Sequence, residues 1–362
     1  MPLLFCLLLL AASVFGQTVQ ERIAHVEKAV QPAMKAYKVP AVSVAVVNNG
    51  QLEWAHAWGV LAVGEAKPAT PETLFQAASI SKPVASMALL HLVQAGKLSL
   101  DEDVNKRLKG WKLPEGTNVT LRRLLSHTAG LTVHGFPGYE AGAPLPTLVQ
   151  ILDGTKPANT DAIRVDTPPG SIWRYSGGGF TIAQLLAIET TGVPFPDFME
   201  RTVLGPLGMS RSTYRQPLPE ARRPDAAAGH LGSGAMVPGR SHVYPEMAAA
   251  GLWTTPSDLA RVILALEKPG KVLSAGTTAQ MLTAVKNNYG LGIGVKGSGA
   301  GQSFSHGGSN AGFQCMLFGY AERGQGAVVM TNSDAGGRLA EEVLRAISAE
   351  YGWPDYKPSE KK

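Results

Sequence analysis

Two β-rich stretches lie at opposite ends of this chain, and the long segment between them has a helical pattern. Residues 41–60 read AVSVAVVNNGQLEWAHAWGV, in which two apolar and aromatic runs are joined by the turn sequence NNG, a strong hairpin signal. Three runs near the other end are also typical of strands, at residues 289–295, 312–322 and 326–333. The chain therefore predicts an antiparallel sheet assembled from both of its ends.

Helices should flank this sheet and fill the middle of the chain. Residues 21–37 and 336–352 have the pattern of amphipathic helices, and Thr255 with Pro256 forms the cap of another. We expect an α/β fold of the α+β kind, with a ligand cleft between the sheet and a mostly helical inserted region. The expected boundaries are a single catalytic domain over 17–355, with a sheet sub-domain (about 20–97 and 284–352) and a helical sub-domain (about 98–283).

The N-terminus reads MPLLFCLLLLAASVFGQ, an apolar run too short to span a bilayer comfortably, followed by small residues. Val14 and Gly16 form a small-x-small pattern, so we predict a signal peptide over residues 1–16, removed before Gln17. The protein would then be secreted or periplasmic, without stable membrane insertion. Because no positive charge precedes the apolar run, an uncleaved anchor or a buried N-terminal strand remains the alternative.

The amino-acid composition limits the classes of function that this chain can have. The 362 residues are 44% hydrophobic and 17% charged, which is typical of a folded protein of enzyme size. The net charge of +5 comes without a Lys/Arg cluster interleaved with aromatic residues, so a nucleic acid partner is not expected. Cys6 lies in the predicted signal peptide, which leaves Cys315 alone, as a buried strand residue without a disulfide. No metal-ligand motif occurs, so we expect neither a metal nor an organic cofactor.

A lysine at the start of an apolar helix needs explanation. In FQAASISKPVASMALLHLVQAG, residues 75–96, Ser79 and Lys82 are one helical turn apart and share a face, whereas Ser81 points elsewhere. Pro83 is tolerated only in a first turn, which places Ser79 at the helix N-terminus, where developing negative charge is favoured. A lysine among apolar neighbours can act as a base toward a hydroxyl. The alternative is a serine cap beside a lysine that extends to solvent.

Two further segments carry candidate site residues. Tyr175 precedes Ser176, three glycines and a helix; it could supply a reactive phenol or be a core residue, and the segment matches a phosphate loop poorly. FSHGGSNAGF, residues 304–313, contains His306 within a polar, glycine-rich break between strand-like runs. Such a break suits an extended ligand pairing with the sheet edge, and a plain turn with a structural histidine is the alternative.

The order of three short motifs decides between these interpretations. SISK at 79–82, YSG at 175–177 and HGG at 306–308 together resemble the motifs of the penicillin-recognising serine hydrolases. That family includes class C β-lactamases, D-alanyl-D-alanine carboxypeptidases, D-aminopeptidases and β-lactamase-like esterases. The resemblance extends over nearly all of the chain after the signal, with similar stretches at 124–131, 203–214 and 248–263.

The resemblance implies a role for each matching position. Ser79 would be the acylated nucleophile, Lys82 its activating neighbour, and Tyr175 would share proton transfer to and from Ser79 and the hydrolytic water. The backbone N–H groups of Ser79 and Ser309 would form the oxyanion hole. The substrate would bind along the segment formed by His306, Gly307, Gly308 and Ser309.

Two departures from the family pattern affect the expected substrate. Gly177 stands where many members have an asparagine that contacts substrate amides, and His306 stands where many have a lysine that holds a carboxylate. An unperturbed histidine has a pKa near ~6.5, so we predict that an anionic substrate loses affinity as the pH rises from about 5.5 to 8. Both changes favour an ester or a neutral amide. His127 is expected to pack in a loop near the cleft rather than to act as a base.

The sequence thus predicts an exported serine hydrolase that forms an acyl-enzyme with a small amide, peptide or ester. One alternative is a carboxylesterase with little action on β-lactams. Another, from a different class, is a non-hydrolytic penicillin-binding sensor or peptidoglycan-binding protein. The sequence leaves the oligomeric state open.

Overall fold

A computed structural model describes residues 17–354 and 356, so the predicted signal peptide and Cys6 lie outside the described residues. Its central element is a six-stranded antiparallel sheet in the order β2-β1-β8-β7-β6-β5. The strands are β1 (Ala41–Asn48), β2 (Gln51–Gly59), β5 (Gly294–Lys296), β6 (Ser303–Asn310), β7 (Phe313–Tyr320) and β8 (Gly326–Thr331). A separate two-stranded sheet is formed by β3 (Phe75–Gln76) and β4 (Trp253–Thr254).

The helices fall into two groups. Those that pack on the sheet are α1 (Val19–Tyr37), α9 (Pro256–Glu267) and α11 (Gly336–Glu350). The longer helices of the inserted region are α2 (Ser81–Gln94) and α5 (Gly177–Thr191). The shorter ones are α3 (Leu121–Leu125), α4 (Leu148–Asp153), α6 (Phe195–Met199), α7 (Gly205–Leu207), α8 (Met247–Ala250) and α10 (Ala275–Met281). Short 3-10 helices are η1 (Ala78–Ile80), η2 (Val104–Lys106), η4 (Glu220–Asp225) and η5 (Gly299–Gly301), and η3 (Glu200–Leu204) is a short π-helix.

The two ends of the chain meet in the middle of the sheet. Strand β1 pairs with β2 on one side and with β8 on the other, where Val44 lies opposite Val329. The hairpin between β1 and β2 turns at Asn49 and Gly50, which both have positive φ, at 52° and 65°, as a tight two-residue hairpin turn requires. The predicted fold class, an antiparallel sheet built from both chain ends, is therefore confirmed.

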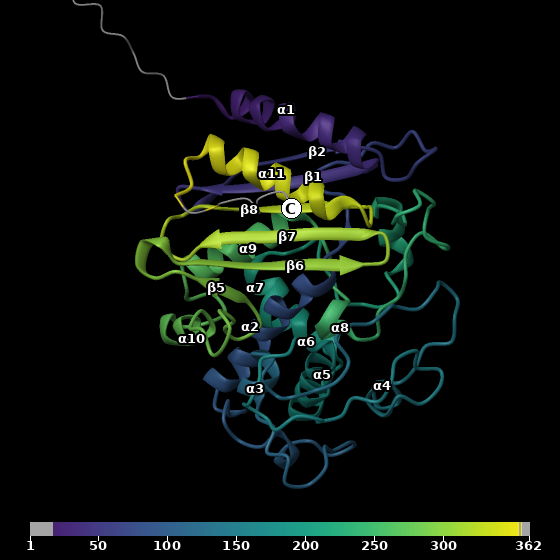
Figure 1. Ribbon diagram of the computed structural model, residues 1–362, viewed down its shortest axis with the longest axis vertical. Coiled ribbons are helices and arrows are strands. Elements are labelled where there is room, and N and C mark those ends of the chain that lie inside the picture. Colours follow the sequence, from purple (N-terminus) through teal and green to yellow (C-terminus); the bar gives the residue numbers. More distant parts are fainter. Residues whose placement is uncertain (1–16, 355, 357–362) are drawn as a thin grey trace, which may run out of the picture.

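Apolar layers cover both faces of the sheet. Helices α1 and α11 pack against one face over Val42, Val44 and Val46, and α9 packs against the other together with the helical region. Figure 1 shows α1 above the strands and α11 lying across β1 and β8, with the helical region, including α2, α3 and α5, below the strands. Because both faces are covered, β1 is buried at every one of its residues rather than at alternate ones.

One segment differs from the sequence-based expectation. The polar, glycine-rich run that we expected to interrupt the sheet is strand β6, which pairs with β7 along all eight of its residues. Its residues alternate between buried and more exposed positions, with Phe304, His306, Gly308 and Asn310 buried. Pairing with an apolar neighbouring strand overrides the weak strand preference of this sequence.

No helix within 17–354 is long and apolar enough to cross a bilayer. In that same part of the chain, no group of three or more His, Cys, Asp or Glu side chains is placed to hold a metal ion.

Candidate active site

Ser79 lies in a tight turn immediately before helix α2. The turn is the single helical turn η1, and Ala78 within it has a φ of 48°, a strained conformation for a residue with a Cβ atom. The backbone before the turn is fixed, because the Ala77 N–H donates to Leu252 O at 2.8 Å. Ser79 itself is half-buried and lines a cleft. The structure thus places this serine at the helix N-terminus, as the position of Pro83 predicts.

Lys82 lies one turn farther along and contacts Ser79 directly. Its side chain is 2% exposed, and Nζ donates hydrogen bonds to Ser79 Oγ at 2.9 Å and to Ala249 O at 2.8 Å. Nζ also lies 4.9 Å from the centroid of the Tyr175 ring. The predicted contact between Ser79 and Lys82 is therefore present, and it gives a proton a direct path between the two groups.

Ser81, the other serine of the motif, has a structural place. Its side chain is fully buried, and its Oγ donates to Ala78 O at 2.5 Å and accepts from the Leu252 N–H at 3.0 Å. These bonds join the turn that carries Ser79 to the segment before β4. Ser81 points away from the cleft, as its position in the helical turn predicts.

Tyr175 lies immediately before Ser176, the N-cap residue of α5, and its side chain lines the cleft. The Ser176 hydroxyl caps this helix by accepting from the Gly179 N–H at 3.3 Å. The Tyr175 ring is surrounded by histidines: the ring centroids of His127, His134 and His306 lie 4.2, 4.9 and 6.2 Å from it. Tyr175 thus lines the cleft from the residue before the α5 cap, and Lys82 lines it from α2.

The edge of the cleft opposite these helices is strand β6. Gly308 packs against the turn before Ser79 so closely that a Cβ atom there would lie 2.3 Å from Ala77 O and 2.4 Å from Cys315 Sγ. Glycine is therefore the residue that lets β6 approach the nucleophile turn. The Cys315 thiol donates to Ala77 O at 3.0 Å, and burial raises the pKa of this thiol, so the prediction of a buried strand cysteine is confirmed.

The next residue outward on β6, Ser309, is exposed at the cleft. Its hydroxyl accepts from Gln314 Nε2 at 2.7 Å, which ties it to the neighbouring strand β7. Its backbone lies on the same edge as Gly307 and Gly308, and all three line the cleft with Ser79. The oxyanion-hole role that the family resemblance implies for the Ser309 N–H remains a prediction.

His306 also lines the cleft, but its charge differs from the sequence-based expectation. Its ring is 8% exposed; Nδ1–H donates to Gly307 O at 2.6 Å, and Nε2 accepts from the Tyr289 hydroxyl at 2.9 Å. Burial, with a smaller contribution from Lys82, lowers the pKa of His306 to about 3. The expectation that His306 gains and loses a charge between pH 5.5 and 8 is therefore wrong, because both nitrogens are satisfied in the neutral form.

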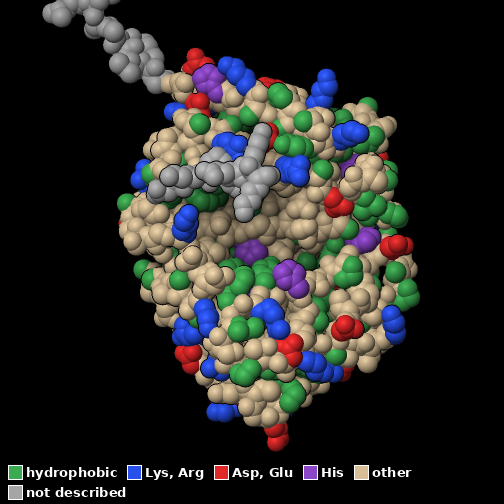
Figure 2. All heavy atoms as spheres, in the orientation of Figure 1, with side chains coloured by type: hydrophobic (Ala, Val, Ile, Leu, Met, Phe, Trp, Pro, Cys, Tyr) green, Lys and Arg blue, Asp and Glu red, His purple; other side chains and the backbone are tan. Residues whose placement is uncertain are grey.

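The predicted site residues all line one cleft of about 860 Å³. Figure 2 shows this hollow between the sheet and the helical region, with histidine in and beside it and most charged side chains nearer the periphery. Among the described residues that line it, Lys82 is the one lysine or arginine and Glu341 the one carboxylate. The residues concerned are Ser79, Lys82, Tyr175, His306, Gly307, Gly308 and Ser309.

The space beside Gly177 is already filled. Its N–H donates to His134 O at 2.9 Å, and a Cβ atom there would lie 3.0 Å from Phe136 Cε2. The loop that carries His134 and Phe136 therefore occupies the space that a side chain at position 177 would need. Phe136 places an aromatic ring at this part of the cleft wall.

Three aromatic residues of the cleft were not identified from the sequence. Trp173, Phe136 and Tyr289 line it, with the rings of Trp173 and Tyr289 5.8 Å apart. None belongs to a recognisable motif. Only Trp173, two residues before Tyr175, carried a usable signal, because neighbours of a site residue often share its cleft.

Comparison with known proteins gives a family match and curated relatives. The family model described as Beta-lactamase matches residues 26–350. Penicillin-binding protein 4* of Bacillus subtilis (strain 168) is 22% identical over 346 residues, covering 88% of this chain and 75% of that protein. A Beta-lactamase of Pseudomonas fluorescens is 28% identical over 276 residues, covering 74% and 72%. Esterase EstB of Burkholderia gladioli is 24% identical over 322 residues, covering 78% of each.

Solved structures resemble the chain over most of its length. The octameric penicillin-binding protein homologue from Pyrococcus abyssi superposes with a TM-score of 0.77 at 24% identity, covering 91% of this chain and 77% of the other. The D-amino acid amidase from Ochrobactrum anthropi SV3, complexed with L-phenylalanine amide, superposes with a TM-score of 0.72 at 21% identity, covering 91% and 99%. At these identities the likeness establishes the fold alone.

Proposed function

The chain belongs to the Beta-lactamase family of serine hydrolases, and from this premise we propose that it hydrolyses a small neutral ester or amide through an acyl-enzyme on Ser79. The observation that carries the proposal is the position of Lys82. A buried ammonium group bonded to Ser79 Oγ and Ala249 O, at the base of an open cleft, is costly unless it is used. Activation of the serine is the use that this geometry offers.

The chemistry follows from the positions of these groups. Ser79 Oγ attacks the substrate carbonyl carbon and gives its proton to the Tyr175 phenolate, whose negative charge the Lys82 ammonium group stabilises, and the tyrosine then passes that proton to the departing alcohol or amine. The backbone N–H groups of Ser79 and Ser309 stabilise the negative charge on the carbonyl oxygen. Water then attacks the acyl-enzyme and gives a proton to the Tyr175 phenolate, and this proton passes to Ser79 Oγ as the bond to the acyl group breaks, which releases the acid and the free serine.

The charge of the cleft favours uncharged substrates. His306 is neutral over the working pH range, and the Lys82 ammonium is already bonded to Ser79 and Ala249. Neither offers a substrate carboxylate a free cation. The aromatic wall of Phe136, Trp173 and Tyr289 suits an apolar acyl group instead. An esterase and a D-amino acid amidase among the similar proteins support both an ester and an amide as the bond cleaved.

We also propose that the protein is exported. The apolar N-terminal run with Val14 and Gly16 supports a signal peptide over residues 1–16. N-terminal sequencing of the mature protein recovered from the culture medium or the periplasm should begin at Gln17. Recovery of the chain with Met1 intact would contradict this part of the proposal.

The nucleophile can be identified directly. A fluorophosphonate probe should label Ser79, and Ser79→Ala should lose both the label and the turnover of a neutral p-nitrophenyl ester. Ser309→Ala is the matched control, because Ser309 is exposed in the same cleft while only its backbone N–H has a proposed role. A label on Ser309, or turnover that survives Ser79→Ala, would refute the proposal.

Turnover and substrate preference distinguish the proposed hydrolase from the alternative functions. A penicillin-binding sensor would trap one equivalent of acyl group on Ser79 and release nothing, whereas a hydrolase releases product many times over. Rates with nitrocefin, which bears a carboxylate, should fall far below those with a neutral p-nitrophenyl ester or a D-amino-acid anilide. A higher kcat/KM for nitrocefin than for both neutral substrates would favour a β-lactamase.

A further inference from the structure

We infer that His127 is a positioning residue that fixes Tyr175 for proton transfer by binding the backbone on both sides of it and packing against its ring. The inference rests on the proposed function, because it assigns a role toward the Ser79 chemistry. It goes beyond the loop-packing place that the sequence predicts for His127.

His127 makes three contacts with the segment that carries Tyr175. Its carbonyl oxygen accepts from the Arg174 N–H at 2.9 Å, and its Nδ1 accepts from the Ser176 N–H at 3.2 Å. Its ring packs against the Tyr175 ring with centroids 4.2 Å apart and planes inclined by 38°. One residue therefore holds the position before Tyr175, the position after it, and the ring itself.

The backbone of His127 has a strained conformation, and this conformation allows the contacts. Its φ is 59°, in the left-handed region that a residue with a Cβ atom rarely adopts. Such strain persists where surrounding bonds over-determine the conformation, and it clusters at functional sites. Here the left-handed turn directs both the carbonyl group and the imidazole of His127 toward residues 174–176.

The hydrogen-bond pattern also shows what His127 does not do. Because Nδ1 accepts from the Ser176 N–H, the proton of the neutral ring lies on Nε2. Burial, followed by the charge of Lys82, lowers the pKa of His127 well below its usual range, so the ring stays neutral. The one basic lone pair is thus already in use. His127 cannot act as the general base, which leaves proton transfer to Lys82 and Tyr175.

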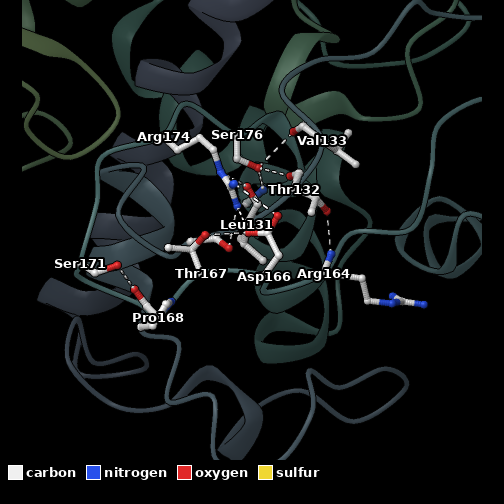
Figure 3. A network of polar contacts seen from close by, with 12 residues as sticks. Leu131, Thr132, Val133, Arg164, Asp166, Thr167, Pro168, Ser171, Arg174 and Ser176 are labelled. Atoms are coloured by element: carbon white, nitrogen blue, oxygen red, sulfur yellow. Dashed lines mark hydrogen bonds and ion pairs between the residues drawn. The ribbon is translucent and has the colours of Figure 1, made fainter.

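Other bonds hold the same segment in place without touching the Tyr175 ring. Figure 3 shows the Arg174 guanidinium directed at Asp166 and at the carbonyl group of Leu131, and Ser176 Oγ donating to the carbonyl groups of Thr132 and Val133. Loss of the imidazole at 127 should therefore leave the loop folded. Its effect should fall on the orientation of Tyr175, where a displacement of about 1 Å costs on the order of 100-fold in rate.

Two substitutions separate the parts of this role. His127→Asn keeps a hydrogen-bond acceptor close to the position of Nδ1, and asparagine tolerates a positive φ. His127→Phe keeps a ring against Tyr175 but removes the acceptor for the Ser176 N–H. Thr128→Val is the matched control, because it deletes the buried Ser126–Thr128 hydroxyl contact of 2.8 Å in the same loop without touching Tyr175.

The experiment measures kcat and KM for a neutral p-nitrophenyl ester, with Tm as a check on folding. We expect His127→Phe to lower kcat about tenfold or more with KM within about twofold, His127→Asn to recover most of that loss, and Thr128→Val to lower Tm without changing kcat. In a Tyr175→Phe background, His127→Phe should cost no more than about twofold, because the group it positions is gone. If His127→Phe fails to fold, the same cycle is run with His127→Gly, which adopts the positive φ without strain and removes both the ring and the acceptor.

The outcomes distinguish this inference from the proposed function. An equal loss of kcat in both backgrounds, or a loss that appears only in KM, would overturn the role of His127 while leaving Ser79 as the nucleophile. Equal losses in His127→Asn and His127→Phe would overturn the part assigned to the Ser176 bond. If Tyr175→Phe itself has no effect on kcat, the proposed proton path fails first.

Discussion

Alanine at Gly308 should inactivate the protein, whereas alanine at the neighbouring Gly307 should not. A Cβ atom at Gly308 would lie 2.3 Å from Ala77 O, which is backbone and cannot rotate away. At Gly307 the nearest atom to a new Cβ would be Met316 Cε at 3.7 Å, an ordinary contact. The two positions belong to one motif on one strand, so they differ mainly in this approach to the nucleophile turn.

The magnitude follows from the overlap. To bring the contact from 2.3 Å to an ordinary separation, β6 and the turn that carries Ser79 must move apart by about 1 Å. Overpacking of this kind costs about 1–3 kcal/mol of folding free energy, and a misplacement of about 1 Å at a reacting group costs on the order of 100-fold in rate. Gly308→Ala should therefore lower Tm by several degrees and kcat/KM by about 100-fold, and Gly307→Ala should change kcat/KM by less than about fivefold.

The assay is kcat/KM for a neutral p-nitrophenyl ester together with the rate of fluorophosphonate labelling at Ser79. A third variant, Gly308→Ala with Cys315→Ala, removes the Sγ atom that the new Cβ would meet at 2.4 Å but leaves Ala77 O in place. It should remain as inactive as Gly308→Ala. Activity within a few-fold of wild type in Gly308→Ala, or an equal loss in Gly307→Ala, would refute the steric reasoning; recovery in the double variant would assign the constraint to the sulfur.

Three further predictions concern the proton path, stability and the cleft wall. Lys82→Ala and Tyr175→Phe should each lower kcat at least about 100-fold with the double variant little worse, and fully multiplicative losses would argue against a shared path. Burial raises the pKa of Glu246 from 4.5 to about 7, so the folded state keeps a proton that the unfolded chain loses, and stability should fall as the pH rises from about 4.5 through 7. The Tm advantage of Glu246→Gln over wild type should therefore grow between pH 5 and pH 8, and parallel Tm curves would contradict this linkage. Gly177→Asn should lower kcat/KM, because Phe136 fills the space that the new side chain needs. Adding Phe136→Ala to this variant should restore part of the lost kcat/KM, and an equal loss in the single and double variants would exclude the steric cause.

The fold was predictable where the signals are local. The β1–β2 hairpin follows from two positive-φ turn residues between apolar runs, and the Thr255 cap of α9 follows from a four-residue pattern. The contact between Ser79 and Lys82 needs only one turn of helix. Each of these features depends on residues within a few positions of one another, which a single sequence displays.

Strand β6 was not predictable in the same way. Its sequence, SFSHGGSN, is rich in residues that are rare in strands, and glycine weakens a strand interior. What holds it extended lies outside its own residues: the full-length pairing with β7, which follows after a two-residue turn, and the close approach of Gly308 to Ala77, which is distant in the sequence. The glycine that argues against a strand is the residue that allows the strand to reach the nucleophile.

The charge of His306 is likewise a property of the folded protein rather than of the motif. The neutral ring depends on burial and on the Tyr289 hydroxyl, which comes from a loop before β5. A lysine placed at 306 would bring an ammonium group into this buried position beside Lys82, where like charge and lost solvation both disfavour it. Recognition of a carboxylate at this place therefore requires more than a cation in the third motif. The pocket around such a cation must also admit water or supply a hydrogen-bond acceptor for it. In this chain the Tyr289 side chain and the backbone close the pocket to both.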